Sequence, residues 1–133
     1  MKIHLIVLIV LLGFTLKAQL SVEVLPIRLG TQKAIVPLKF KNDLPNRVDA
    51  ARAVCFLLDE NGKVVAQATR WVIGQKAPKL ASQERATFNF VITGPAPFST
   101  TNLTAKVSFT RLLLATNVVG DVRKDIHITM GQN

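Results

Sequence analysis

Apolar side chains recur at every second position in several short segments of this chain. The clearest alternating faces are those of Ala34, Val36, Leu38 and Phe40, of Ala86, Phe88, Phe90 and Ile92, and of Ala105, Val107, Phe109, Arg111 and Leu113. A period of two is typical of a β-strand with one buried face, because successive side chains point to opposite sides. No segment after residue 18 repeats its apolar residues with a helical period. The sequence therefore predicts an all-β protein.

Seven such segments, with turn and loop residues between them, occupy about 110 residues, and this spacing predicts a two-sheet sandwich. We expect a single domain over residues 19–133, with an immunoglobulin-like antiparallel β-sandwich of about seven strands. A closed barrel of the same strands is the alternative. The chain has one cysteine and one tryptophan, so it lacks the Cys–Trp–Cys pattern of antibody domains. The expected likeness is to the wider immunoglobulin-like class.

The first 18 residues have a different character. Lys2 precedes a long apolar stretch that ends close to Ala18, which is the pattern of a secretory signal peptide. We expect a signal helix here, similar to bacterial secretory signals, and cleavage between Ala18 and Gln19. The stretch is shorter than the roughly 20 apolar residues of a membrane span. The mature chain is thus expected to be secreted or periplasmic without a membrane span, and retention of the segment as an anchor is the alternative.

The mature chain is basic, and its charges are dispersed. Residues 1–18 contain two of the 17 Lys and Arg residues and none of the eight Asp and Glu residues, so 15 against 8 leave a net charge of +7. Such an excess favours anionic partners, including an anionic glycan, through long-range attraction. Specific nucleic-acid binding is not expected, because bases stack on aromatic side chains and the chain has no Tyr and one Trp.

Residues able to support catalysis are scarce. Cys55 and His127 are the one thiol and the one imidazole of the mature chain, and both lie in apolar, strand-like segments. A cysteine in such a segment is typically a small buried hydrophobe, so a Cys–His dyad is not expected. Residues 59–62 have too few acidic ligands for a calcium loop. No phosphate loop, nucleophile elbow or metal-binding spacing occurs, so we expect a non-catalytic protein without cofactor or metal.

The segment FLLDENGKVVAQATRWVIG, residues 56–74, predicts a β-hairpin with DENG as its turn. Aspartate first and glycine fourth favour a type I turn that ends in a left-handed Gly62, with Asp59 opposite Lys63. Extending this register gives one face that combines Val54, Phe56, Leu58, Val64, Ala66, Ala68 and Val72 and ends in Arg52 and Arg70. The other face then combines Ala51, Ala53, Cys55, Leu57, Val65, Gln67, Thr69 and Trp71. A two-residue Asn–Gly turn would shift the pairing by one residue and mix these sets.

Neither face of this hairpin is as polar as a solvated sheet surface should be. One explanation is that another segment of the chain, such as the N-terminal strand, covers the second face. The other explanation is a partner-binding patch of Val54, Phe56 and Leu58, rimmed by Arg52 and Arg70. The second explanation makes the protein an interaction module for a protein or an anionic glycan. A structural subunit of an envelope assembly that pairs through an edge strand is the alternative function.

Three features of residues 36–92 resemble the bacterial secreted immunoglobulin-like modules of the FxLYD type. They are a loop with lysine and asparagine after the second strand, KFKNDLPN, an apolar strand that ends in an aspartate–glycine turn, FLLDENGKVV, and a strand with alternating phenylalanines, LASQERATFNFVI. The aromatic residue that normally precedes the turn aspartate is replaced by Leu58. The resemblance implies a non-catalytic envelope or extracellular module, brings no site residues, and suggests that Cys55 faces the core.

Overall fold

Strand β3 (Lys33–Asn42) organises the first of two sheets in a computed structural model that describes residues 18–131. One edge of β3 pairs antiparallel with β6 (Arg85–Thr93). The other edge pairs with two strands in succession, β1 (Leu20–Val24) and β2 (Arg28–Leu29). The alternating faces predicted for residues 33–42 and 85–93 thus lie side by side and turn the same way.

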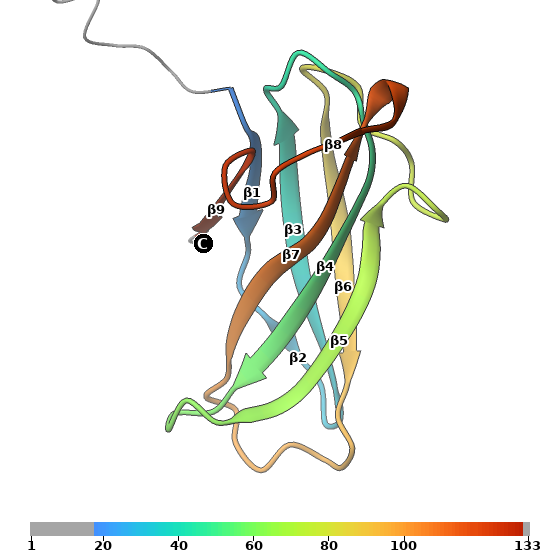
Figure 1. Cartoon of the computed structure of the whole chain (residues 1–133). Helices are drawn as coiled ribbons and strands as arrows, with labels where there is room; N and C mark the ends of the chain where they lie inside the picture. Colours follow the sequence, from blue (N-terminus) through green and yellow to red (C-terminus); the bar gives the residue numbers. More distant parts are fainter. Residues whose placement is uncertain (1–17, 132–133) are drawn as a thin grey trace, which may run out of the picture.

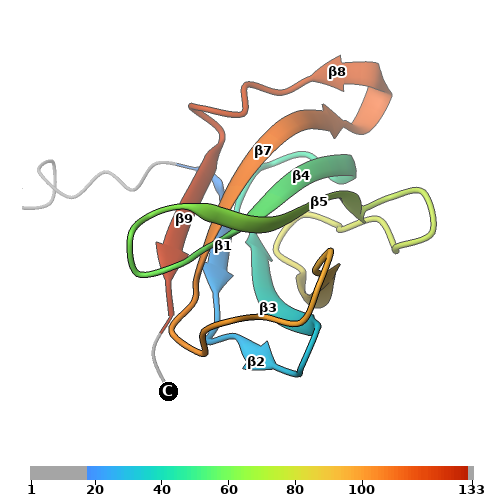
Figure 2. The same ribbon diagram turned by 90° about the horizontal axis from the view of Figure 1, so that it is seen from below.

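Strand β4 (Val48–Leu58) is the centre of the second sheet. It pairs antiparallel with β5 (Val64–Ile73) on one side and with β7 (Thr104–Leu114) on the other. The short strand β8 (Val118–Val119) adds to the free side of β7. Figures 1 and 2 show the two sheets packed face to face. The fold is an all-β sandwich, as the alternation of apolar residues predicts.

Seven longer strands form the sandwich, because two of the nine strands, β2 and β8, have only two residues each. Strand β9 (Ile126–Met130) pairs with β1 in the parallel direction, whereas the other strand pairs of the described chain are antiparallel. The 3₁₀ turn Ala115–Asn117 is the one helical segment in residues 18–131. This described part holds no helix with the length and apolar content needed to cross a membrane. The predicted signal helix lies outside the described residues.

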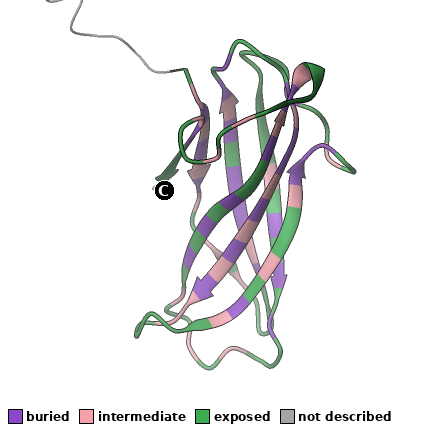
Figure 3. Ribbon diagram, viewed as in Figure 1, coloured by how far each residue is buried: buried purple, intermediate pink, exposed green. Residues whose placement is uncertain are grey.

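Side chains from both sheets fill the space between them, and Figure 3 shows the resulting alternation of buried and exposed positions along the strands. Several large side chains are fully buried: Phe90, Leu20, Leu38, Leu57, Ile73, Leu80, Ile92 and Leu112. Each contributes about 1.5–3 kcal/mol by leaving water. Apolar burial therefore stabilises the sandwich without a disulfide, since the chain has a single cysteine.

Pro37 lies in the interior strand β3, although prolines in sheets normally occupy edges or bulges. Its carbonyl oxygen accepts a hydrogen bond from the Leu25 N–H at 2.9 Å, so its nitrogen, which carries no proton, faces the same neighbour. On this side Pro37 faces the segment between β1 and β2, which includes Leu25 and Pro26. The missing donor of Pro37 therefore falls where the neighbouring ladder is already interrupted.

Asn42 ends β3 and is the one buried polar side chain of the described residues. Its Nδ2 amide donates to the carbonyl oxygens of Asn46 (2.9 Å), Leu80 (3.2 Å) and Ala81 (3.2 Å). Its Oδ1 accepts from the Leu44 N–H at 3.0 Å. This one amide therefore joins the loop that follows β3 to the segment that precedes β6.

Candidate functional site

The turn of the β4–β5 hairpin forms as the sequence predicts. Gly62 has a φ of +79°, and its N–H donates to the Asp59 carbonyl oxygen at 3.0 Å. The Asp59 N–H donates to the Lys63 carbonyl oxygen at 2.9 Å. The Asp59 carboxylate accepts from the N–H groups of Asn61 and Lys63. The left-handed glycine and the placement of Asp59 opposite Lys63 are confirmed, and the acidic group serves the turn.

Beyond the turn, the register departs from the prediction. Leu58 pairs with Val64, but Leu57 pairs with Ala66, so Val65 is an extra residue that forms a β-bulge. Because side chains alternate with a period of two, one extra residue moves the rest of β5 to the opposite face. Ala66 shares the face of Leu57 and is buried. The predicted grouping of the hairpin residues is therefore wrong.

The Cys55 face of β4 points into the core. Ala53, Cys55 and Leu57 all have 0% exposure, as the resemblance to FxLYD-type modules suggests. Arg70 pairs with Ala53 and so lies on this face of the sheet, where it stays exposed because β5 is an edge strand. The prediction that Arg70 rims the same patch as Arg52 is wrong, again because of the bulge.

The opposite face of β4 carries Arg52, Val54, Phe56 and Leu58, which we term the outer patch. All four residues are half-buried, although β5 and β7 are in place on both sides. Their cross-strand neighbours are mainly polar and include Gln67, Thr69, Trp71, Thr104, Lys106, Ser108 and Arg111. Strand β1 belongs to the other sheet. The idea that the N-terminal strand covers this face is therefore wrong.

A separate hollow, which we term the edge groove, opens beside the end of β5. Its volume is about 560 Å³, and it is lined by Arg70 and Trp71 of β5, by Gln75, Lys76, Ala77 and Pro78 of the following loop, and by Phe88 of β6. Its apolar residues are Trp71, Phe88, Ala77 and Pro78, and its charged residues are Arg70 and Lys76. The edge groove is therefore a mainly apolar cleft that two cationic residues and no acidic residue line.

Each aromatic side chain of the edge groove contacts another side chain of the protein. Arg52 Cζ lies 5.5 Å from the centroid of the Trp71 ring, which is a cation–π contact. The Phe88 ring meets the fully buried Phe90 edge to face, with 6.1 Å between centroids and 81° between planes. Trp71 is thus also the point at which the edge groove adjoins the outer patch.

The loop wall of the edge groove depends on Gly74. Gly74 and Gln75 both have left-handed backbone angles, with φ values of +79° and +57°, and the Gly74 N–H donates to the Pro78 carbonyl oxygen at 3.3 Å. A Cβ atom on Gly74 would lie 2.2 Å from the Asp49 carbonyl oxygen and 2.9 Å from the Ala50 Cα. Only glycine fits this close approach of the loop to β4.

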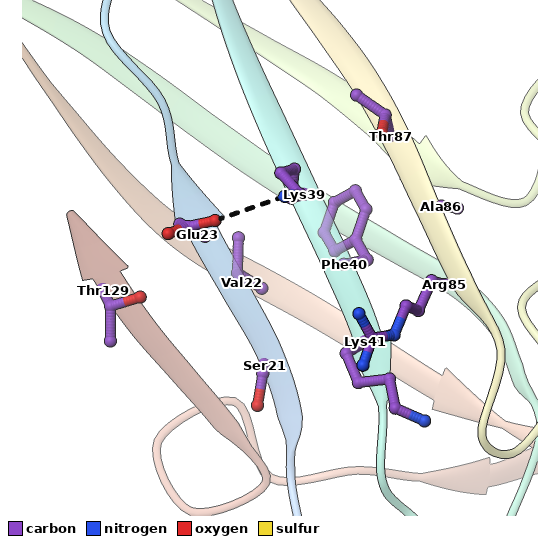
Figure 4. A pocket seen from close by; sticks show the side chains of 10 residues that line it. All are labelled: Ser21, Val22, Glu23, Lys39, Phe40, Lys41, Arg85, Ala86, Thr87 and Thr129. Atoms are coloured by element: carbon purple, nitrogen blue, oxygen red, sulfur yellow. Dashed lines mark ion pairs between the residues drawn. The ribbon is translucent and has the colours of Figure 1, made fainter. Parts of the chain in front are cut away.

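A polar hollow of about 360 Å³ lies on the outer face of the first sheet (Figure 4). Its charged side chains are Glu23, Lys39, Lys41 and Arg85. Lys39 Nζ lies 3.9 Å from Glu23 Oε1, and Lys41 Nζ lies 3.5 Å from Asp43 Oδ1. Two of its three cations are therefore already paired within the protein. For an anionic ligand, the polar hollow is a weaker candidate than the edge groove.

Cys55 and His127 are not brought together. Cys55 is buried on the core face of β4, whereas His127 is exposed on β9 and in register with Ser21 of the other sheet. Burial raises the pKa of the Cys55 thiol to about 12, which disfavours the thiolate that a nucleophile needs. Within residues 18–131, no cluster of three or more His, Cys, Asp or Glu side chains is placed to hold a metal ion.

The buried thiol predicts how stability depends on alkaline pH. Burial raises the pKa of Cys55 in the folded protein from its ordinary 9.0 to about 12. The contribution of the neutral thiol to the free energy of unfolding is therefore fully present below pH 9 and is lost as the pH rises toward 12. Relative to Cys55→Ala, we expect the free energy of unfolding to fall by up to about 1.4 kcal/mol per pH unit in this window. Urea titrations of both proteins measure the difference, and parallel pH profiles would contradict burial of the thiol.

Trp71 and Phe88 are the candidate binding residues that sequence reasoning missed. It placed Trp71 with Cys55 and Phe88 with Phe90, on faces that pointed to core packing. A lone tryptophan between Arg70 and a loop rich in Gln, Lys, Ala and Pro was the available signal. This signal could not identify a site by itself, because the site also needs Phe88, and only the packing of the two sheets places Phe88 near Trp71.

Comparisons with known proteins return no relatives. No protein-family model, no curated protein and no solved structure matches the chain. The resemblance to FxLYD-type modules is therefore neither supported nor opposed by a relative, and it stays a prediction.

Proposed function

We propose that the protein is a non-catalytic interaction module that binds a partner protein through the outer patch. The observation that carries this proposal is the stripe of Val54, Phe56 and Leu58 along the middle of a sheet face. These three side chains are only partly buried, although both flanking strands are in place. Contiguous apolar surface rimmed by polar residues is typical of protein–protein contact sites.

The charges beside the stripe indicate the kind of partner. Arg52 lies at one end of the stripe, and on β7 Lys106 pairs with Phe56 and Arg111 pairs with Arg52. None of the residues paired with the outer patch is acidic. A partner with an apolar centre and an acidic rim matches this surface, because opposite charges guide encounter and exclude wrong partners.

The proposal places this module outside the cytoplasm after cleavage between Ala18 and Gln19. Gln19 already belongs to the sandwich, because its carbonyl oxygen accepts from the Asp43 N–H at 3.0 Å and its side-chain amide donates to the Lys124 carbonyl oxygen at 2.9 Å. A chain that begins at Gln19 therefore keeps every contact of β1. Export and lack of catalysis remain parts of this proposal.

The variant Phe56→Lys tests whether the outer patch is surface or core. We expect it to lower the free energy of unfolding by no more than about 1.5 kcal/mol, because Phe56 is half-buried. Thr69→Lys adds the same charge at an exposed position paired with Val54 and is the control. Urea denaturation measures both variants. A loss of several kcal/mol in Phe56→Lys alone would place Phe56 in the core and contradict the proposal.

Edge pairing is the second candidate function, and exposed apolar residues on two edge strands favour it. Val119 of β8 is 76% exposed and Met130 of β9 is 59% exposed, and within the described chain each strand pairs on one side only. Such edges are templates for added strands. Size-exclusion chromatography with light scattering separates the two functions. The outer-patch proposal predicts a monomer at low and high salt, and edge pairing predicts oligomers.

A further inference from the structure

We propose that the edge groove is a second binding site, which takes an apolar side chain from an acidic, extended peptide segment lying along β5. This site adjoins the outer patch at Trp71 but shares no lining residue with it, so it does not depend on the function proposed above. The inference rests on the shape and charge of the edge groove and on the free edge of β5 beside it.

The edge groove is already formed in the free protein. Phe88 is fixed by Phe90, Trp71 is fixed by Arg52, and the loop wall is fixed by the close approach of Gly74 to β4. A cleft built on strands and a constrained loop costs little ordering on binding. Its mainly apolar lining suits an aliphatic or aromatic side chain.

The charge of the edge groove indicates that the segment is acidic. Arg70 Nη1 donates to the Thr69 carbonyl oxygen, and within the described chain neither Arg70 nor Lys76 forms an ion pair. By contrast, the cations of the polar hollow are largely paired with Glu23 and Asp43. Two cations that line an apolar cleft without an ion pair in the described chain favour carboxylates beside the inserted side chain.

The position of the edge groove indicates that the segment is extended. Within the described chain, β5 pairs only with β4, so its other edge presents unpaired N–H and C=O groups in every second residue. Arg70 and Trp71 belong to the end of that edge. An added strand bonds to the edge through its backbone and places one side chain in the cleft beside it. A glycan could fill the cleft but would not form the backbone hydrogen bonds of an added strand along β5. A peptide would use both features, so we favour a peptide.

Trp71 reports on this site directly, because it is the only tryptophan of the chain. The probe is the blocked peptide Glu-Val-Glu-Phe-Glu-Val-Glu, titrated into residues 19–133 at low salt while Trp71 emission is recorded. We expect a saturable shift to shorter wavelength as the ring leaves water. We expect no comparable shift with the peptide that has Lys in place of each Glu, or with the one that has Ala in place of Phe.

Charge reversal locates the peptide on the protein. We expect the double variant Arg70→Glu/Lys76→Glu to weaken binding at least about tenfold. Lys33→Glu/Arg123→Glu makes the same change of charge at exposed positions outside the edge groove, and we expect it to stay within about twofold of the unaltered protein. Equal losses of peptide affinity in both double variants would mean that the net charge of the protein alone controls binding, which would overturn the proposal.

Two further outcomes separate this site from its rivals. Phe56→Lys should leave the titration unchanged, and loss of binding in that variant would move the peptide to the outer patch and overturn the edge groove. An oligogalacturonate that shifts Trp71 emission where the acidic peptide does not would make the occupant a glycan and overturn the peptide. No emission change with the acidic peptide at millimolar concentration would likewise overturn the proposal.

Discussion

Replacing Asn42 by aspartate is expected to lower the free energy of unfolding by about 4 kcal/mol at neutral pH, one of the two largest effects we expect of a single substitution. The Asn42 amide donates to three carbonyl oxygens in a fully buried position. A carboxylate of the same shape donates to none of them and brings negative charge toward all three. Against a total stability of about 5–15 kcal/mol, this loss is large enough to populate the unfolded chain.

The Asn42→Asp variant should also become less stable as the pH rises. Burial beside carbonyl oxygens raises the pKa of the new carboxyl above its unfolded value of about 3.9. The penalty is therefore smallest in acid, where the carboxyl is protonated and donates one hydrogen bond, and it grows as the pH rises toward 7. Urea denaturation between about pH 4 and 7 measures the trend. Asn46→Asp makes the same chemical change at an exposed position and should show neither effect.

Replacing Gly74 by alanine is the second large effect, with an expected loss of about 3–4 kcal/mol. Part of the loss comes from the left-handed backbone of Gly74, with its φ of +79°. The rest comes from the new Cβ, which would lie 2.2 Å from the Asp49 carbonyl oxygen and 2.9 Å from the Ala50 Cα. Both atoms belong to the backbone of β4, so relief requires the whole loop after β5 to move.

Gly62→Ala is the matched control for Gly74→Ala. Gly62 has the same φ of +79°, but nothing lies within 4 Å of the Cβ position. Its substitution is expected to cost about 1 kcal/mol, from the backbone conformation alone. Thermal or urea denaturation of the two variants separates strain from the clash. Equal losses would mean that the loop after β5 does not lie against β4, and the edge groove would lose one wall.

The alternation of apolar residues predicts much of this fold because it is a local property. Phe90 and Ile92 show the same period of two in the sequence and in the buried face of β6. The DENG turn is equally local, since the Gly62 N–H donates a hydrogen bond to the Asp59 carbonyl oxygen within the turn. The parallel pairing of β9 with β1 is not local, and nothing in the segment IHITM specifies its neighbour.

The candidate sites were harder to predict, because they depend on contacts between distant residues. One extra residue, Val65, moves Arg70 to the face opposite Arg52, where it lines the edge groove together with Phe88. The sequence pattern does not mark this bulge, because Val65 lies in an apolar run where either register is plausible. That Val54, Phe56 and Leu58 share one face of β4 follows from the sequence, since they are alternate residues of one strand.

Photo-crosslinking from position 56 would show whether the outer patch binds a partner protein. Benzoylphenylalanine in place of Phe56 is compared with the same residue in place of Lys33, an exposed position at the start of β3 in the other sheet. We predict one defined adduct from position 56 in cells that express the protein, lost when Val54 and Leu58 are both changed to lysine, and none from position 33. Absence of an adduct at position 56, or the same adduct from both positions, would contradict this prediction.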